Sequence, residues 1–410
     1  MAISRAEMRS RFTKEKIPLK QKLLGYGGFD FPFMVIVTIL LCLGLVLMFS
    51  ASYVYASRHF SNPYHFIERQ AIWAVIGFAA MLIISKMNLD ILRKLAIPGI
   101  LLSVALLVVA LAMPGSSDFA RWIVIPGTNF QFQPSEMAKF GLILFYAYAM
   151  EKYQKPSHVL AKELDGSRLR RFGARWWSTG MYLGVLMILM GLVFFANHVS
   201  GMIIIGGIGF LMIFIGDQRI PLWLYGAGIA LAIIVGVFVW HNPEILPGHA
   251  AVRIIAHQDP WSDPTGSNWQ TIQSLLAVGS GGWFGQGWGR SIQKHLYLPE
   301  PQNDFVFAIV AEEIGFIGAI LILILFVLLV WRGFMIALHT KDRFGTLLVL
   351  GIVLQVGLQV ALNVAVITAM IPNTGIPLPF FSYGGTALVM LLAQMGVVLA
   401  VSRISREIKK

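Results

Sequence analysis

Long apolar segments run along this chain from near Phe33 almost to its C-terminus. Backbone groups in lipid must hydrogen-bond within their own segment, so each such run predicts a membrane-spanning helix. Breaks at proline, glycine and charged residues divide the sequence into about ten runs, each near the roughly 20 residues that a bilayer requires. We expect the spans at residues 33–54, 71–86, 95–113, 135–151, 178–196, 200–216, 222–241, 305–331, 346–370 and 383–402.

These helices leave no room for a separate soluble domain. Of the 410 residues, 57% are hydrophobic and 13% are charged, against about 25% charged in ordinary soluble domains. We expect a single all-α polytopic membrane domain at residues 31–402, between a basic N-terminal tail at 1–30 and a short basic tail at 403–410. The first apolar run is followed by no small-residue cleavage site, which predicts a retained helix and not a signal peptide.

Lysine and arginine are distributed unevenly over the loops. With a cytoplasmic N-terminus, 25 of the 32 lie in cytoplasmic segments and six in the opposite loops, and Lys139 lies within a span. Basic residues accumulate on the cytoplasmic side, so we expect both termini there. The same bias accounts for the net charge of +12, and we expect no nucleic-acid partner.

Two external segments have an unusual composition. The loop at 242–303, between the seventh and eighth helices, is rich in Trp, Gly, Pro, Asp and His, and long loops in compact proteins are usually functional. The segment at 371–383, IPNTGIPLPFFSY, has three prolines and a glycine where an apolar helix would continue. Non-helical backbone at this depth is tolerated only where it lines a cavity or is buried in protein, which predicts a partly re-entrant segment.

Charged residues within the spans are few, and each is a functional candidate because a charge in lipid is costly. Glu136 and Lys139 lie three residues apart on the fourth helix, close enough for an ion pair on one face near its outer end. The pair would either lock two helices together or present the Lys139 ammonium to a diphosphate in a polar cavity. For Glu312 and Glu313, two turns into the eighth helix, we expect a structural ion pair with Lys139 or Arg253.

Asp304 opens the eighth helix at the external interface. One interpretation is an N-cap that accepts backbone N–H bonds. The other is a general base, because an inverting glycosyl transfer needs one group to take the proton of the attacking hydroxyl. On the residues alone, Asp304 is the best-placed single candidate for that base.

The glycine-rich stretch at 279–289 lacks the spacing of a Walker motif. Trp283 and Trp288 instead predict a loop in the headgroup layer, where indoles anchor. Lys294 then lies where a diphosphate headgroup would be. The nine histidines show no metal-ligand spacing, and a single cysteine excludes an intramolecular disulfide, so we expect no structural zinc.

Four segments resemble the SEDS family of shape, elongation, division and sporulation proteins. They are FQPSEMAK at 132–139, NWQTIQSLLAVGSGGWFGQGWGRSIQKHLYLPE at 268–300, NDFVFAIVAEEIGFIG at 303–318 and TGIPLPFFSYGGT at 374–386. Together they extend the resemblance over nearly the whole chain. The GRSIQKHLYLP form of the second segment resembles the division branch, FtsW, more than the elongation branch, RodA.

The resemblance implies an enzyme of the bacterial inner membrane that polymerises lipid II, an undecaprenyl-diphosphate-linked disaccharide pentapeptide, into peptidoglycan strands at the outer face. The family's essential aspartate falls on Asp304. It would take the proton of the acceptor 4-hydroxyl as that oxygen attacks C1 of the donor sugar, and undecaprenyl diphosphate would leave. Lys139, Arg253, Lys294 or a divalent cation, Mg²⁺ or Mn²⁺ with Asp304 as a candidate ligand, would neutralise the leaving group. No organic cofactor is expected.

Glu136, Gln293 and Ser382, which lie in the matching segments, complete the predicted substrate-binding set. The resemblance also implies a class B penicillin-binding protein, a transpeptidase, and other division proteins as partners. Two other functions stay open: a lipid II flippase, and a non-catalytic activator of the transpeptidase. A flippase needs a charged path through the midplane, whereas the charged candidates here cluster in the outer half, which favours the enzyme.

The chain departs from the family pattern at two places. The common His-Thr ahead of the aspartate is Gln302–Asn303, so no role of that histidine is carried over. A Pro-Asp-Leu-Gly element between the fifth and sixth spans is replaced by NHVS at Asn197–Ser200. We expect His198 to be an exposed loop histidine.

Overall fold

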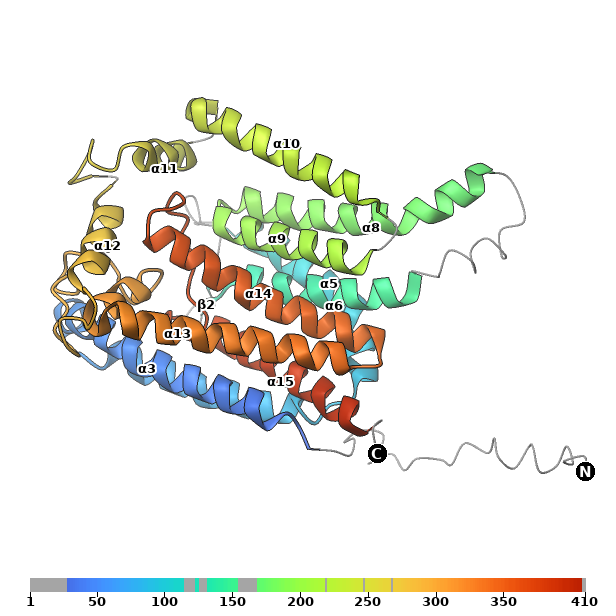
Figure 1. The fold of residues 1–410 in the computed structure, drawn as a ribbon, viewed down its shortest axis with the longest axis horizontal. Helices are drawn as coiled ribbons and strands as arrows, with labels where there is room; N and C mark the ends of the chain where they lie inside the picture. Colours follow the sequence, from blue (N-terminus) through green and yellow to red (C-terminus); the bar gives the residue numbers. More distant parts are fainter. Residues whose placement is uncertain are drawn as a thin grey trace, which may run out of the picture.

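The described part of the chain is mainly α-helical, with one short two-stranded sheet (Figure 1). The computed structural model describes residues 28–113, 122–124, 131–153, 168–217, 220–245, 248–266 and 268–407. The helices are α3 (Phe31–Phe60), α4 (His65–Ile84), α5 (Leu89–Ala112), α6 (Pro134–Tyr153), α8 (Arg168–Phe195), α9 (Val199–Gly216), α10 (Leu222–His241), the 3-10 turn η1 (Pro243–Ile245), α11 (Gly248–Gln258), α12 (Trp269–Ser280), α13 (Val306–His339), α14 (Arg343–Ile367) and α15 (Gly385–Glu407). Strands β1 (Ile123–Val124) and β2 (Gln131–Phe132) pair antiparallel. The all-α fold class is confirmed.

Nine of the described helices are long and apolar enough to cross a membrane. A tenth, α6, is 20 residues long but contains Glu136, Lys139 and Glu151 within any 18 consecutive residues, which lowers its hydropathy. It packs against α5, α9 and α14 inside the bundle, and most of its side chains are buried. Because protein and not lipid surrounds α6, the helix tolerates these charges, and it completes the ten predicted spans.

Several helices extend beyond the predicted apolar limits. The first covers residues 31–60 against a prediction of 33–54, and the eighth covers 306–339 against 305–331. Asp30 caps α3, since its Oδ1 accepts from Phe33 N at 3.1 Å. The apolar pattern marks the part of a helix in lipid, whereas capped ends continue through polar sequence at the interface.

The start of α3 and the end of α15 lie at one end of the bundle, and α11 and α12 lie at the other (Figure 1). This arrangement agrees with termini on one side and the long loop at 242–303 on the opposite side. Many of the basic residues that predict orientation, at 1–27, 154–167, 218–219 and 408–410, lie outside the described residues. Most of the predicted N-terminal tail therefore lies outside them as well, whereas residues 403–407 of the predicted C-terminal tail are described and belong to α15.

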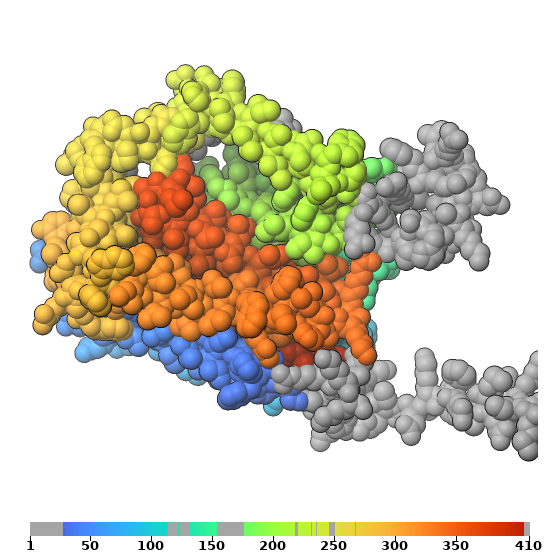
Figure 2. Space-filling model, viewed as in Figure 1, coloured from blue at the N-terminus to red at the C-terminus, as the bar shows by residue number. Residues whose placement is uncertain are grey.

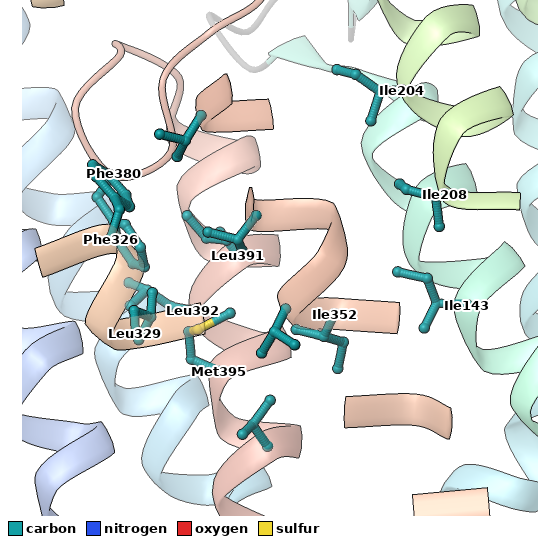
Figure 3. Close-up of a cluster of buried hydrophobic side chains, with 14 of the residues drawn as sticks. Ile143, Ile204, Ile208, Phe326, Leu329, Ile352, Phe380, Leu391, Leu392 and Met395 are labelled. Atoms are coloured by element: carbon teal, nitrogen blue, oxygen red, sulfur yellow. The ribbon is translucent and has the colours of Figure 1, made fainter. Parts of the chain in front are cut away.

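The centre of the bundle is formed by α14 and α15, of whose spanning residues 67% and 72% are buried. Figure 3 shows Leu391, Leu392 and Met395 of α15 in this core, with Ile352 of α14 nearby. By contrast, only 6% of the spanning residues of α10 are buried. In Figure 2 the surface is hollowed between α10 and the bundle. Near the start of α10, however, Tyr225 packs on Phe214 of α9 with ring centroids 4.9 Å apart.

The predicted re-entrant segment is confirmed as non-helical backbone buried in protein at residues 371–384. It descends deeply, because a Cβ added at Gly44, near the middle of α3, would collide with the carbonyl oxygen of Phe380. The Phe380 ring also lies 6.4 Å from that of Phe326, well inside α13 (Figure 3). Glycine at position 44 therefore lets the segment approach α3.

The glycine-rich loop enters a break in α13 that the sequence did not predict. Gly315 has φ +70° and ψ −175°, which interrupts the helix. The carbonyl oxygens of Glu312 and Glu313, which would bond within an unbroken helix, accept instead from Gln286 N at 2.9 Å and Gly287 N at 3.1 Å. The loop therefore satisfies carbonyl groups that the break would leave without partners.

The amide groups on the other side of the break are satisfied by the same loop. Phe316 N donates to Gly282 O at 2.8 Å, and Ile317 N donates to Trp283 O at 3.1 Å. The Trp283 indole is 67% exposed, in agreement with an interfacial position. Loop and helix thus form one hydrogen-bonded unit that fixes the outer part of α13.

We expect Gly285→Ala to destabilise the protein strongly. Gly285 has φ +81°, and a Cβ there would collide with the backbone of Glu313 and Gly315. Backbone strain and overpacking together cost about 2–6 kcal/mol. The matched control is Gly279→Ala on α12, where a Cβ meets nothing within 4 Å. Thermal unfolding in detergent checks both, and equal stability of the two variants would contradict the packing of the loop into the break.

Candidate active site

Asp304 lies immediately before α13 at the outer end of the bundle and is partly buried. Because Phe305 occupies the N-cap position of α13, the interpretation of Asp304 as the cap is wrong. The carboxylate faces the re-entrant segment, where a Cβ added at Gly375 would lie 2.9 Å from Asp304 Oδ2. Gly375 also has φ +70°, a backbone conformation that glycine adopts without strain. Glycine at this position therefore permits the turn and also leaves space for the Asp304 carboxylate.

Asn363 of α14 fixes the position of Asp304. Its Nδ2 donates to Asp304 O at 2.8 Å and to Ile376 O at 2.6 Å, and so joins the start of α13 to the re-entrant segment. A second link runs from Tyr383 N to Gln302 O at 2.8 Å. Sequence reasoning missed Asn363 because it searched the spans for charges, whereas a lone amide within apolar helix was the available signal.

Three buried polar atoms near Asp304 have no hydrogen-bond partner among the described residues. They are Gln302 Oε1, Asn363 Oδ1 and Thr374 Oγ1. Each such atom costs about 1–3 kcal/mol when it stays unpaired. Their concentration beside the carboxylate indicates a place where polar groups of a ligand would complete the hydrogen bonding.

The predicted ion pair on the fourth helix is confirmed. Lys139 Nζ lies 2.7 Å from Glu136 Oε1, and both side chains are buried. Nearby, Gln133 Nε2 lies 3.4 Å from His198 Nε2. The prediction of an exposed His198 is wrong, since its side chain is 9% exposed and its ring packs over Gly201 at the start of α9.

Lys294 is not a free cation in this structure. Its Nζ lies 2.7 Å from Glu313 Oε1, and Ser50 Oγ on α3 donates to the same carboxylate at 2.7 and 2.8 Å. The predicted structural ion pair is therefore confirmed for Glu313, but its partner is Lys294 and not Lys139 or Arg253. Lys294 of the external loop forms the ion pair with the Glu313 carboxylate instead. Spacing along a helix does not reveal such a contact between different segments.

Glu312, in contrast to Glu313, has no ion-pair partner among the described residues, so the expected ion pair is not found for it. Its carboxylate accepts from Ser291 Oγ at 2.5 Å, from Ile292 N at 2.9 Å and from Gln293 N at 3.3 Å. Gln293 thus contributes its backbone to this contact. Ser382 has a local role as well, because its Oγ accepts from Leu378 N at 2.7 Å within the re-entrant segment.

Arg253 lies on α11, in the external loop. It lines a cavity of about 240 Å³ with His257, Gln270, Thr271 and Asn373. Sequence analysis treated this region as a loop, but α11 and α12 are helices, and their short amphipathic patterns were hidden by the surrounding Gly, Pro and Trp residues. Sequence reasoning singled out Arg253 and missed the other lining residues, which also include Val252 and Ala256.

The predicted cations therefore differ in their electrostatic state. Lys139 and Lys294 are each neutralised by a buried carboxylate, whereas Arg253 has no ion-pair partner in the part of the chain that the structure describes. Within the same residues, no group of three or more His, Cys, Asp or Glu side chains is placed to hold a metal ion. A cation at Asp304 would thus need further ligands from substrate phosphates and water, as Mg²⁺ commonly has.

Comparisons with known proteins agree with this architecture. The profile of the FtsW/RodA/SpoVE family, cell cycle proteins, matches residues 32–407. "Probable peptidoglycan glycosyltransferase FtsW" of Geobacter metallireducens is 36% identical over 380 residues, 91% of this chain and 94% of that protein. "Stage V sporulation protein E" of Bacillus subtilis is 37% identical over 382 residues, 92% of this chain and 98% of that protein.

Solved structures extend the similarity to the fold. One chain of a peptidoglycan synthase complex, described as coordinating polymerization and crosslinking, superposes with a TM-score of 0.70 at 28% identity, covering 92% of this chain and 98% of that one. The rod shape determining protein RodA of Thermus thermophilus gives 0.62 at 26% identity, with 91% and 96% covered. Profile, relatives and structures agree over nearly the full length, and the chain belongs to the FtsW/RodA/SpoVE family of cell cycle proteins.

Proposed function

We propose that this chain is a peptidoglycan glycosyltransferase of the bacterial inner membrane that polymerises lipid II into glycan strands at the outer face. The observation that carries the proposal is the position of Asp304 at the outer end of the bundle, among buried polar atoms that have no described partner. Support comes from relatives at 36% identity that are named probable peptidoglycan glycosyltransferase FtsW. The strand would be made for the division septum.

In this proposal Asp304 is the general base. The acceptor 4-hydroxyl donates its proton to the carboxylate while its oxygen forms the bond to C1 of the donor sugar. The C1–O bond to the diphosphate breaks, and undecaprenyl diphosphate leaves with the electron pair. A positioned base of this kind contributes about 10²–10⁴-fold to the rate. Asn363 holds the main chain of residue 304 beside the re-entrant segment, and Gly375 leaves room for the carboxylate.

The charge that develops on the leaving diphosphate has to be neutralised. Lys139 and Lys294 supply little net charge, because each lies 2.7 Å from a carboxylate oxygen. Arg253 and a divalent cation, Mg²⁺ or Mn²⁺, therefore become the stronger candidates for this role. Such a cation would act as a Lewis acid at the diphosphate, with Asp304 as its protein ligand. The Glu136–Lys139 pair would orient substrate as a dipole and not as a free charge.

The undecaprenyl chain needs lateral access from the lipid. The hollow between α10 and the bundle offers such a path, since only 6% of the spanning residues of α10 are buried (Figure 2). Glycines on α10, such as Gly226 and Gly228, have no neighbour within 4 Å of an added Cβ. A polyprenyl chain could occupy this space while the sugar headgroup reaches Asp304.

We further propose that the chain works with a class B penicillin-binding protein, a transpeptidase that cross-links the new strand, and with other division proteins. The solved chain that it resembles belongs to a complex that coordinates polymerization and crosslinking. The outer end of the bundle, with α11 and α12, is the face at which nascent strand and transpeptidase would meet.

The direct test uses purified protein, fluorescent lipid II and the purified transpeptidase, with and without EDTA. We expect polymer in the presence of the transpeptidase, and a loss of at least tenfold after chelation, restored by Mg²⁺ or Mn²⁺. Polymer that is insensitive to EDTA would remove the cation from the proposal. Lipid II translocation without polymer would favour the flippase, and polymer made only by an added control enzyme would favour the non-catalytic activator.

A further inference from the structure

The polar cavity beside α11 is a second feature of the outer face, and we call it the Arg253 cavity. It lies between α11, the start of α12 and residue Asn373 of the re-entrant segment. Its volume of about 240 Å³ is below the roughly 300–1,000 Å³ of sites for drug-sized ligands. The cavity therefore fits one polar group of a larger substrate and not a whole disaccharide.

Arg253 gives the cavity its charge. None of the described lining residues is acidic, and Arg253 makes no hydrogen bond or ion pair with another described residue. Burial lowers the pKa of His257 below its ordinary value, so the imidazole is neutral at pH 7. A guanidinium stays protonated at any physiological pH, and a partly buried, uncompensated guanidinium is complementary to an anion.

The amide side chains of the lining leave donors available. Asn373 Nδ2 donates to Gln270 Oε1 at 3.0 Å, and Asn373 Oδ1 accepts from Gly375 N at 3.2 Å. Both amide oxygens are thus occupied, whereas Gln270 Nε2 and the Thr271 hydroxyl have no described partner. Donors grouped around a guanidinium match a group that carries only acceptor oxygens.

The cavity is close to Asp304. Positions 373 and 375 are at most about 7 Å apart along an extended backbone. A Cβ on Gly375 would lie 2.9 Å from Asp304 Oδ2. A substrate whose reacting sugar lies at Asp304 could therefore place a neighbouring anionic group in the cavity.

We propose that the Arg253 cavity binds an oxyanion of the lipid-linked substrate, with Arg253 as the anchoring cation and Gln270 and Thr271 as further donors. The inference rests on the proposed function, because lipid II supplies the anionic group. Two groups of lipid II have the required chemistry, the diphosphate and the carboxylates of its pentapeptide. Either would be held by charge-assisted hydrogen bonds to the guanidinium.

The test measures binding without turnover. Full-length protein in nanodiscs is titrated separately with radiolabelled undecaprenyl diphosphate and with the free pentapeptide. We expect Arg253→Gln to weaken binding of one probe by about 10- to 100-fold, the loss of a charge-assisted contact. Arg253→Lys keeps the positive charge but loses the paired N–H donors of the guanidinium. Its affinity for that probe should lie between those of the wild type and Arg253→Gln. The matched control is Arg58→Gln, an exposed external arginine that undergoes the same charge change.

The probe that loses affinity identifies the anionic group. Binding of neither probe to the wild type, or equal binding by Arg253→Gln and Arg58→Gln, would overturn the proposal. Polymerisation of lipid II is assayed on the same samples after addition of the purified transpeptidase. Polymer without any dependence of binding on Arg253 would refute the cavity alone, whereas Arg253-dependent binding without polymer would refute the glycosyltransferase and leave the cavity standing.

Discussion

Asp304→Asn should lower glycan polymerisation by about 100- to 10,000-fold while the protein stays folded. Asparagine keeps the size of the side chain but does not accept a proton at neutral pH. The backbone links that position residue 304, from Asn363 Nδ2 and through Tyr383 to Gln302, are unchanged by the substitution. Stability should therefore be nearly unaffected, and the loss should appear in kcat.

The control for this variant is Glu68→Gln, which neutralises an exposed carboxylate at the outer end of α4. We expect its polymerisation rate to equal that of the wild type. Initial rates with fluorescent lipid II, together with thermal unfolding of each variant, make the comparison. A folded Asp304→Asn protein with more than about a tenth of wild-type turnover would exclude this carboxylate as the base.

Lys294→Met should destabilise the protein by about 3–5 kcal/mol, because it leaves the Glu313 carboxylate buried without its cation. The double variant Lys294→Met/Glu313→Leu removes both charges and should recover most of that loss. Lys94→Met, an exposed lysine on α5, serves as the control and should change stability by less than about 0.5 kcal/mol.

The double variant also separates a structural lysine from one that binds substrate. If Lys294 only holds the loop against α13 and α3, the stable double variant should polymerise lipid II at close to the wild-type rate. If Lys294 contacts the diphosphate, the double variant should be folded but slow, with a raised KM. Unfolding temperatures and steady-state kinetics on the same preparations distinguish the two outcomes.

The helices of the membrane domain were predictable because lipid imposes a simple rule of length and hydropathy on each of them. Even α6, which carries four charged residues, has an apolar run that the rule detects. The non-helical segment at 371–384 was predictable for a related reason, since three prolines cannot continue a helix in lipid. The break at Gly315 could not be predicted, because one glycine in an apolar run is compatible with an unbroken helix.

The identity of the candidate base was also accessible from sequence, since Asp304 is a carboxylate at the outer end of an apolar helix. Whether each lysine or arginine forms an ion pair could not be predicted from the sequence. Whether a lysine is free depends on contacts between distant residues, such as Ser50, Lys294 and Glu313. Only the folded chain shows that Lys139 and Lys294 are paired while Arg253 has no ion-pair partner among the described residues.

The most direct test of the central claim is the sidedness of polymer synthesis. Protein is reconstituted in vesicles with a known orientation, and lipid II is supplied in one leaflet at a time. The account predicts strands, sensitive to a membrane-impermeant muramidase, only when lipid II is in the leaflet on the side of Asp304 and the Arg253 cavity. Strands formed only from the leaflet on the side of the termini, or lipid II moved across the bilayer without strands, would contradict it.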